Sequence, residues 1–320
     1  MESNEFLAFW GWRHLPWSQP PNVDQLFWQR STLTLAQKLQ AHLQRSYGLC
    51  VIEGPIGHGK STFARWLYQQ YLPAHDDVAF FALGQSQAEP GWLVPLLARY
   101  LGLPAGACSS SEVFAKLHES RLRKRPLTLI FDQAERLQRQ EAYDDILSLI
   151  QAKQHGMMPV NIVLLSSSKL GKMPSLFERL APKLWFHGDI VPFDTQEIGQ
   201  FLIYYLKSLG LSLQALSPEA YSLITEAAPP TFSGIESVLE SCLVEAYFKQ
   251  QRIIQADVVQ DVLQKRAPLL ETEDSENLHK TAKQAFRKRP LAKNMAGTTA
   301  ALDLNSLYYK SDGSQDPEDS

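Results

Sequence analysis

The chain has 320 residues, of which 44% are hydrophobic and 20% are charged, as in ordinary soluble globular proteins. A formal net charge of −3 does not predict a polyanionic partner, and 3 cysteines are too few for a disulfide framework or a cysteine-rich zinc site. No apolar run approaches the roughly 18 residues of a membrane helix, and the amino terminus lacks the pattern of a secretory signal. We therefore expect a cytoplasmic protein without a membrane span.

The first 30 residues are rich in aromatic side chains and prolines, and we expect these rings to pack on the core. Over residues 31–190, short apolar runs alternate with helical periodicity that begins at Ser31, a candidate N-cap. Apolar strands separated by helices predict an α/β domain with a parallel sheet covered on both faces. We expect strands at 48–53, 78–83, 127–131, 160–165 and 183–188, and helices at 61–72, 91–103, 111–122 and 142–154.

A small all-helical lid domain is expected over residues 191–266. Asp194 and Glu197 have the spacing of a capping box, and Gly210 is placed to end the first helix of this domain. Three further stretches with helical periodicity follow, at 217–228, 234–250 and 255–266.

Residues 267–320 lose this periodicity and contain acidic and basic blocks, which predicts a disordered tail. One apolar and aromatic stretch, 300–310, interrupts the tail and has its densest part between Leu302 and Tyr309. Two interpretations stay open for it. It is either a docking peptide for a protein partner or a segment that folds back on its own domain.

The strongest motif is G-x-x-x-x-G-K-[ST] at 54–61, directly after a predicted strand and before a predicted helix. Glycines let the backbone curl so that successive N–H groups point at phosphate oxygens. We expect Lys60 to contact the β- and γ-phosphates of ATP, Ser61 to ligate Mg²⁺, and His58 to be an exposed, variable position. The complete set of expected loop contacts is Gly54, Pro55, Ile56, Gly57, His58, Gly59, Lys60, Ser61 and Thr62.

Asp132 ends the apolar strand at 127–131, where such a site needs a carboxylate for the magnesium ion. Gln133 follows, where a hydrolysing site of this design has a glutamate that accepts a proton from water. Glu135 is an alternative base. If a helix begins at Gln133, however, side chains two residues apart diverge by about 200°, and Glu135 would point elsewhere.

Three other sets of polar residues are candidates for contacts with a nucleotide or with DNA. Ser166 and the serines after it either face the γ-phosphate or form a polar turn. Arg179 and Lys183 either reach the nucleotide of a neighbouring subunit in a homo-oligomer or are ordinary surface charges. The basic run at 121–125 is either a solvated helix end or a contact for the phosphate backbone of DNA.

The order of these motifs resembles that of the AAA+ ATPases. The stretch FWGWRHLPWSQPPNVDQLFW at 9–28 is similar to the aromatic opening of the ExeA/GspA-type branch, which is associated with bacterial secretion and surface assembly. The likeness covers roughly residues 5–265. It implies a P-loop core with a helical lid, bound ATP and Mg²⁺, and a protein partner in a secretion, surface or motility apparatus.

The chain departs from that branch at three points. Gln133 replaces the usual glutamate, and Ser237 stands where the lid would supply a sensor arginine. In addition, the predicted disordered tail replaces the membrane span and peptidoglycan-binding domain of many members. We therefore expect a nucleotide-dependent switch or assembly factor with slow or absent hydrolysis. The alternative is a DNA-associated AAA+ regulator that resembles the transposition ATPases.

Overall fold

A computed structural model describes residues 3–18, 21–45, 48–71, 77–83, 91–104, 108–122, 127–137, 140–152, 158–167 and 179–266. Residues 1–269 and 270–320 are two separate units. The predictions for the tail and its stretch at 300–310 lie outside the described residues, as do those for Ser168 and for the side chains of 121–125. In the part of the chain that is described, no helix has the length and apolar character needed to cross a bilayer.

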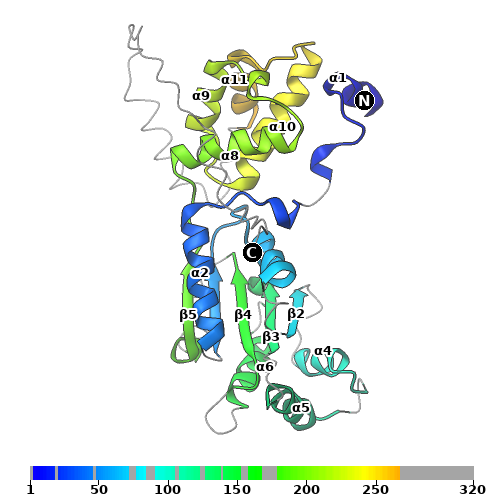
Figure 1. The fold of residues 1–320 in the computed structure, drawn as a ribbon, viewed down its shortest axis with the longest axis vertical. Coiled ribbons are helices and arrows are strands. Elements are labelled where there is room, and N and C mark those ends of the chain that lie inside the picture. Colours follow the sequence, from blue (N-terminus) through cyan, green and yellow to red (C-terminus); the bar gives the residue numbers. More distant parts are fainter. Residues whose placement is uncertain are drawn as a thin grey trace, which may run out of the picture. The chain divides into compact units, whose positions relative to one another are not determined.

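Five strands of the described chain form one parallel sheet, in the order β2-β3-β4-β1-β5 (Figure 1). The predicted α/β fold is therefore confirmed. Central strands are buried along their whole length and the edge strand β5 is not, which is why the sequence signal for β5 was weaker. The strands are β1 Leu49–Glu53, β2 Asp77–Ala82, β3 Leu127–Asp132, β4 Asn161–Ser166 and β5 Leu184–Asp189.

Helices cover both faces of the sheet because successive strand residues point to opposite sides. On β1, Val51 packs in the cluster that includes α4, α5 and α6, whereas Ile52 packs in the cluster that includes α2 and α3. Ser31 lies inside α2, which begins at Arg30, so the N-cap position is Gln29 and the predicted N-cap is wrong by two positions. The helices are α2 Arg30–Arg45, α3 Lys60–Trp66, α4 Leu93–Tyr100, α5 Ser110–Leu122 and α6 Gln140–Gln151.

The helical region after β5 has its own hydrophobic core. Its first helix begins with the expected capping box, in which Asp194 caps the helix and Glu197 bonds back to the Asp194 N–H. Gly210 follows this helix in the left-handed conformation, with φ of 74°. The helices are α8 Thr195–Ser208, α9 Pro218–Ala227, α10 Phe232–Phe248 and α11 Ala256–Arg266.

The aromatic amino-terminal segment packs mainly on the lid rather than on the sheet. Phe6 and Trp10 of α1 (Ser3–Trp10) are buried in the core of the lid. The Trp12 indole N–H donates to the Leu209 carbonyl at 2.7 Å. Trp28 instead packs against the cluster over α2 and α3. The segment therefore contacts both the core of the lid and the cluster over α2 and α3.

Glu197 ties this segment to the lid. Besides capping α8, its Oε2 accepts a hydrogen bond from the Gln29 amide at 3.1 Å, and its Oε1 accepts one from the Arg30 backbone N–H at 3.2 Å. Gln29 is 2% exposed, and its amide also donates to the carbonyl oxygens of Val191 at 3.2 Å and Pro192 at 3.0 Å.

We predict that Glu197→Ala lowers the free energy of unfolding by about 2 kcal/mol, because it removes half of the capping box of α8 and the carboxylate's hydrogen bonds to Gln29 and Arg30. The matched control is Glu219→Ala, an exposed glutamate in the first turn of α9. We expect the control to cost less than about 0.5 kcal/mol. Urea denaturation of both variants measures the difference, and equal losses would contradict the assigned role of Glu197.

Candidate functional site

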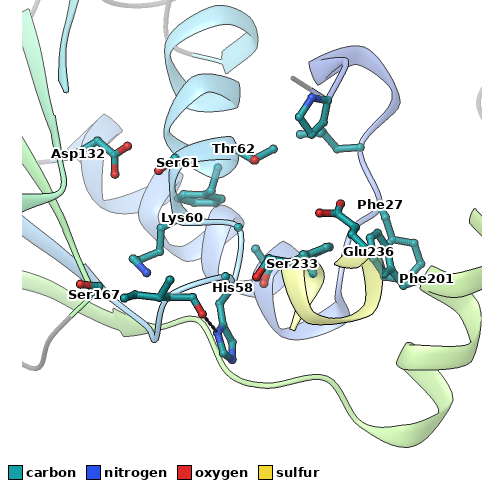
Figure 2. A pocket seen from close by; sticks show the side chains of 18 of the residues that line it. Phe27, His58, Lys60, Ser61, Thr62, Asp132, Ser167, Phe201, Ser233 and Glu236 are labelled. Atoms are coloured by element: carbon teal, nitrogen blue, oxygen red, sulfur yellow. Dashed lines mark hydrogen bonds between the residues drawn. The ribbon is translucent and has the colours of Figure 1, made fainter. Parts of the chain in front are cut away.

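A cavity of about 500 Å³ lies between the phosphate loop, the carboxyl ends of β3 and β4, the lid and the amino-terminal segment (Figure 2). It sits at the carboxyl edge of the parallel sheet, where ligands bind in folds of this type. Of the predicted site residues, Ile56 to Thr62, Asp132, Gln133 and Glu135 all line it. The sheet therefore brings the two main sequence motifs to one place.

The phosphate loop has the curled backbone that its glycines predict. Gly57 and Gly59 have φ of 84° and 80°, a region that side chains other than glycine rarely adopt. The Lys60 Nζ donates hydrogen bonds to the carbonyl oxygens of Gly54 at 2.7 Å and Pro55 at 2.8 Å. Burial lowers the pKa of Lys60, while the charges of Glu135 and Asp132 oppose that shift. The Lys60 ammonium group is thus held by hydrogen bonds to carbonyl groups of its own loop.

His58 is not exposed, contrary to the sequence prediction. It is 5% exposed, and its Nδ1 lies 3.2 Å from the Ile56 carbonyl oxygen. Burial lowers the pKa of His58, and the charge of Lys60 acts in the same direction. The imidazole is therefore neutral at pH 7 and adds no positive charge to the loop.

Glu135 lies in the cavity although helical spacing predicted that it would point elsewhere. The reason is Gln133, whose φ of 62° and ψ of 43° place it in the left-handed region. No helix begins at Gln133, so the 200° argument does not apply, and a short 3-10 turn starts at Ala134 instead. The Glu135 Oε2 accepts a hydrogen bond from the Ser167 backbone N–H at 2.9 Å. Asp132, 3% exposed, accepts the Gln133 N–H at 3.0 Å.

The two described serines at the end of β4, Ser166 and Ser167, lie in different environments. Ser166, proposed from sequence to face the γ-phosphate, is fully buried and is not among the residues that line the cavity. Its carbonyl oxygen accepts the Gly54 N–H at 3.2 Å, so it anchors the start of the phosphate loop. Ser167 is the serine that lines the cavity, because strand alternation turns consecutive residues to opposite faces.

Arg179 lies outside this chain's own cavity. Its guanidinium forms an ion pair with Asp144 on α6, at the surface of the molecule. Arg136, which the sequence analysis did not single out, does line the cavity. It directly follows Glu135 in the 3-10 turn, so the left-handed Gln133 also determines its position.

The amino-terminal end of α10 lies directly on the phosphate loop. The Ser233 backbone N–H donates to the Gly57 carbonyl oxygen at 3.3 Å. A Cβ atom on Gly57 would lie 2.1 Å from the Ser233 Oγ, and one on Gly59 would lie 3.1 Å from the Phe232 ring. Lid and loop can approach this closely only because both loop positions lack a side chain.

The lid presents an acid to the cavity and not an arginine. Ser237, at the expected sensor position, accepts a hydrogen bond from the Arg266 guanidinium of α11 at 2.6 Å. Glu236 lines the cavity instead. Sequence reasoning missed this residue, and it also missed a set of cavity-lining aromatic rings, Phe27, Phe201, Tyr204 and Phe232. Only the aromatic richness of the first 30 residues hinted at them.

A separate group of metal-ligand types occurs where β1 and β5 end. One ligand atom each from Glu53, His187 and Asp189 lies within 4.8 Å of the others. The sequence suggested no such grouping, because the parallel register of the two strands creates it. The His187 Nε2 lies 3.1 Å from the Glu53 carboxylate, so a hydrogen bond between these two side chains brings them together without a metal ion.

A comparison with known families matches the part of the chain that includes the phosphate loop, β3 and β4. Residues 43–173 match the model of a family described as AAA domain. These residues are therefore similar to an AAA domain. No curated protein matches the chain in sequence.

Solved structures with the AAA+ fold resemble residues beyond the family match. The ORC2 protein of Aeropyrum pernix, in ADPNP and ADP complexes, has a TM-score of 0.58 at 16% identity, covering 78% of this chain and 71% of its own. Cdc6p from Pyrobaculum aerophilum has a TM-score of 0.54 at 17% identity, covering 85% and 73%. The Holliday junction branch migration motor RuvB of Thermotoga maritima has 0.52 at 15%, covering 85% and 81%. Identities this low establish the fold alone.

We predict that Gly57→Ala weakens nucleotide binding to the phosphate loop at least tenfold. The new Cβ meets the Ser233 Oγ and strains a backbone with φ of 84°. The control is Gly91→Ala, which has a similar φ of 81° but no atom within 4 Å of its Cβ.

Both variants should lose about 1 kcal/mol of stability from backbone strain, but only Gly57→Ala should lose affinity. Titration with a fluorescent ATP analogue measures affinity, and thermal unfolding measures stability. Unchanged affinity in Gly57→Ala would contradict the assigned geometry of the loop.

Proposed function

We propose that this chain is an ATP- and magnesium-dependent switch or assembly factor with slow or absent hydrolysis. The observation that carries this proposal is the contact of α10 with the phosphate loop, through Ser233 and Phe232 on Gly57 and Gly59. A nucleotide that enters the loop must also meet the lid. Its presence therefore changes the position or rigidity of α10, and a partner can detect that change.

The residues of the cavity fit a triphosphate with Mg²⁺. Backbone N–H groups of the loop would hold the phosphates, and Lys60 would exchange its two carbonyl acceptors for phosphate oxygens. Ser61 and the buried Asp132 offer the hydroxyl and carboxylate oxygens that Mg²⁺ prefers. Bound Mg²⁺ would neutralise phosphate charge next to these acids.

Slow hydrolysis follows from the group beside Asp132. The Gln133 amide can hydrogen-bond a water molecule but cannot accept its proton. Glu135 is a carboxylate in the same cavity, although its Oε2 is already engaged by the Ser167 N–H. Because a carboxylate has further lone pairs, Glu135 is the candidate base for any residual turnover.

We predict that Gln133→Glu raises ATP turnover at least tenfold, because it adds a proton acceptor beside the magnesium carboxylate. Glu135→Gln should lower the residual turnover about tenfold while leaving nucleotide affinity within a few-fold of the wild type. A steady-state phosphate-release assay measures both rates. Lys60→Ala serves as the binding-deficient control. Brisk wild-type turnover that Gln133→Glu does not improve would contradict the switch proposal.

We further propose a bacterial secretion, surface or motility apparatus as the process served, with a protein partner reached through the tail. Support for this process comes from the aromatic stretch at 9–28 and its resemblance to the ExeA/GspA-type branch. In a homo-oligomer, the exposed Arg179 would face a neighbouring subunit's nucleotide, once released from Asp144.

A DNA-associated regulator is the second candidate. Some proteins with a similar fold act on DNA. One of them, the ORC1 protein of Aeropyrum pernix, was solved in complex with DNA, and this supports the second candidate. A gel shift with and without ATP, over a range of salt concentrations, distinguishes the two candidates. ATP-dependent, salt-sensitive retention of duplex DNA would favour the second.

A further inference from the structure

One end of the cavity is a box of aromatic rings from two distant parts of the chain. The Phe27 ring lies 5.4 Å from Phe201 and 6.5 Å from Phe232, measured between centroids. Phe201 and Phe232 are 4.9 Å apart, and Tyr204 is 5.7 Å from Phe27. A flat apolar group is the ligand part that such rings accept. In a nucleotide, that part is the base.

Glu236 is the ionisable side chain of α10 at this end. It stands one helical turn after Phe232, on the same face of α10, so it extends the aromatic wall. Figure 2 shows Glu236 beside Phe27 and Phe201, with Ser233 between them and Lys60. Within the described residues its carboxyl group makes no hydrogen bond and no ion pair. It therefore has both oxygens available for a ligand.

Neighbouring polar groups of the lid are already paired with one another. The Tyr205 hydroxyl donates to the Glu240 carboxylate at 2.6 Å. Arg266 donates to Ser237 at 2.6 Å and to Ser241 at 2.9 Å. Glu236 thus receives no compensating donor from α8 or α11, and it faces the cavity with its hydrogen-bonding capacity unused.

We propose that the Glu236 carboxyl group recognises the adenine base, donating to the ring nitrogen N1 and accepting from the 6-amino group. This inference rests on the proposed binding of ATP. It assigns base selection to a lid residue that stands next to the position expected to carry a phosphate-sensing arginine. The lid would then contact the base, and the phosphate loop would contact the phosphates.

The neutral acid is the form that fits adenine. Burial raises the pKa of the Glu236 carboxyl to about 7, and the charge of Glu240 adds to the shift. A triphosphate in the same cavity brings further negative charge, which disfavours a carboxylate there. A neutral carboxyl has one donor and one acceptor, the pattern complementary to adenine. At the same two positions guanine presents the reverse pattern, an acceptor at O6 and a donor at N1.

The test compares ATP, GTP, 2′-deoxy-ATP and purine riboside triphosphate, which lacks the 6-amino group. Dissociation constants with Mg²⁺ are measured by calorimetry for the wild type, Glu236→Gln and Glu236→Ala. We expect the wild type to bind ATP about tenfold or more tightly than the purine analogue, which cannot donate from position 6. Glu236→Gln keeps one donor and one acceptor and should retain that preference. Glu236→Ala should bind ATP and the purine analogue within about threefold of each other.

The controls separate this inference from the nucleotide site itself. Lys60→Ala should weaken all four nucleotides alike, and Glu226→Ala, an exposed change on α9, should leave their order unchanged. If Glu236→Ala binds ATP but keeps the wild-type preference, base recognition by Glu236 is wrong while the ATP site stands. If it loses discrimination only against 2′-deoxy-ATP, the contact is to ribose and the inference is wrong. No binding of any nucleotide by the wild type overturns both proposals.

Discussion

The contact between the phosphate loop and the first turn of α10 is the constraint on which the site depends. Gly57 and Gly59 have a backbone conformation that disfavours side chains, and the lid occupies the space that those side chains would fill. The same glycines thus serve two purposes. They let the loop curl, and they let Ser233 and Phe232 close the cavity.

The charges around the cavity explain why a nucleotide would need Mg²⁺ here. The acids Asp132 and Glu135 line it, against the cations Lys60 and Arg136, and the buried His58 contributes no charge. Four charges of a nucleotide triphosphate would enter this balance. A divalent ion held by Asp132 reduces the repulsion between the phosphates and the acids. The lid, which supplies Glu236 and no arginine, contributes nothing positive to the phosphate end.

The amino-terminal segment completes the site from the far end of the sequence. Phe27 closes the aromatic box, while Phe6 and Trp10 are buried in the lid and Trp28 packs near α3. Glu197 holds the junction by bonding both the segment and the first turn of α8. Loop, lid and segment therefore meet around one cavity.

The sequence by itself determined the features that consecutive residues encode. Apolar strands and helical periodicity predicted the parallel sheet, and the spacing of glycines with Lys60 predicted the loop. Only the tertiary structure decided which side chains reach the cavity. A single left-handed residue, Gln133, redirected Glu135 into it, and burial lowered the pKa of His58. Glu236 and Phe27 meet only because the chain folds back on itself, and no local pattern records an approach between such distant residues.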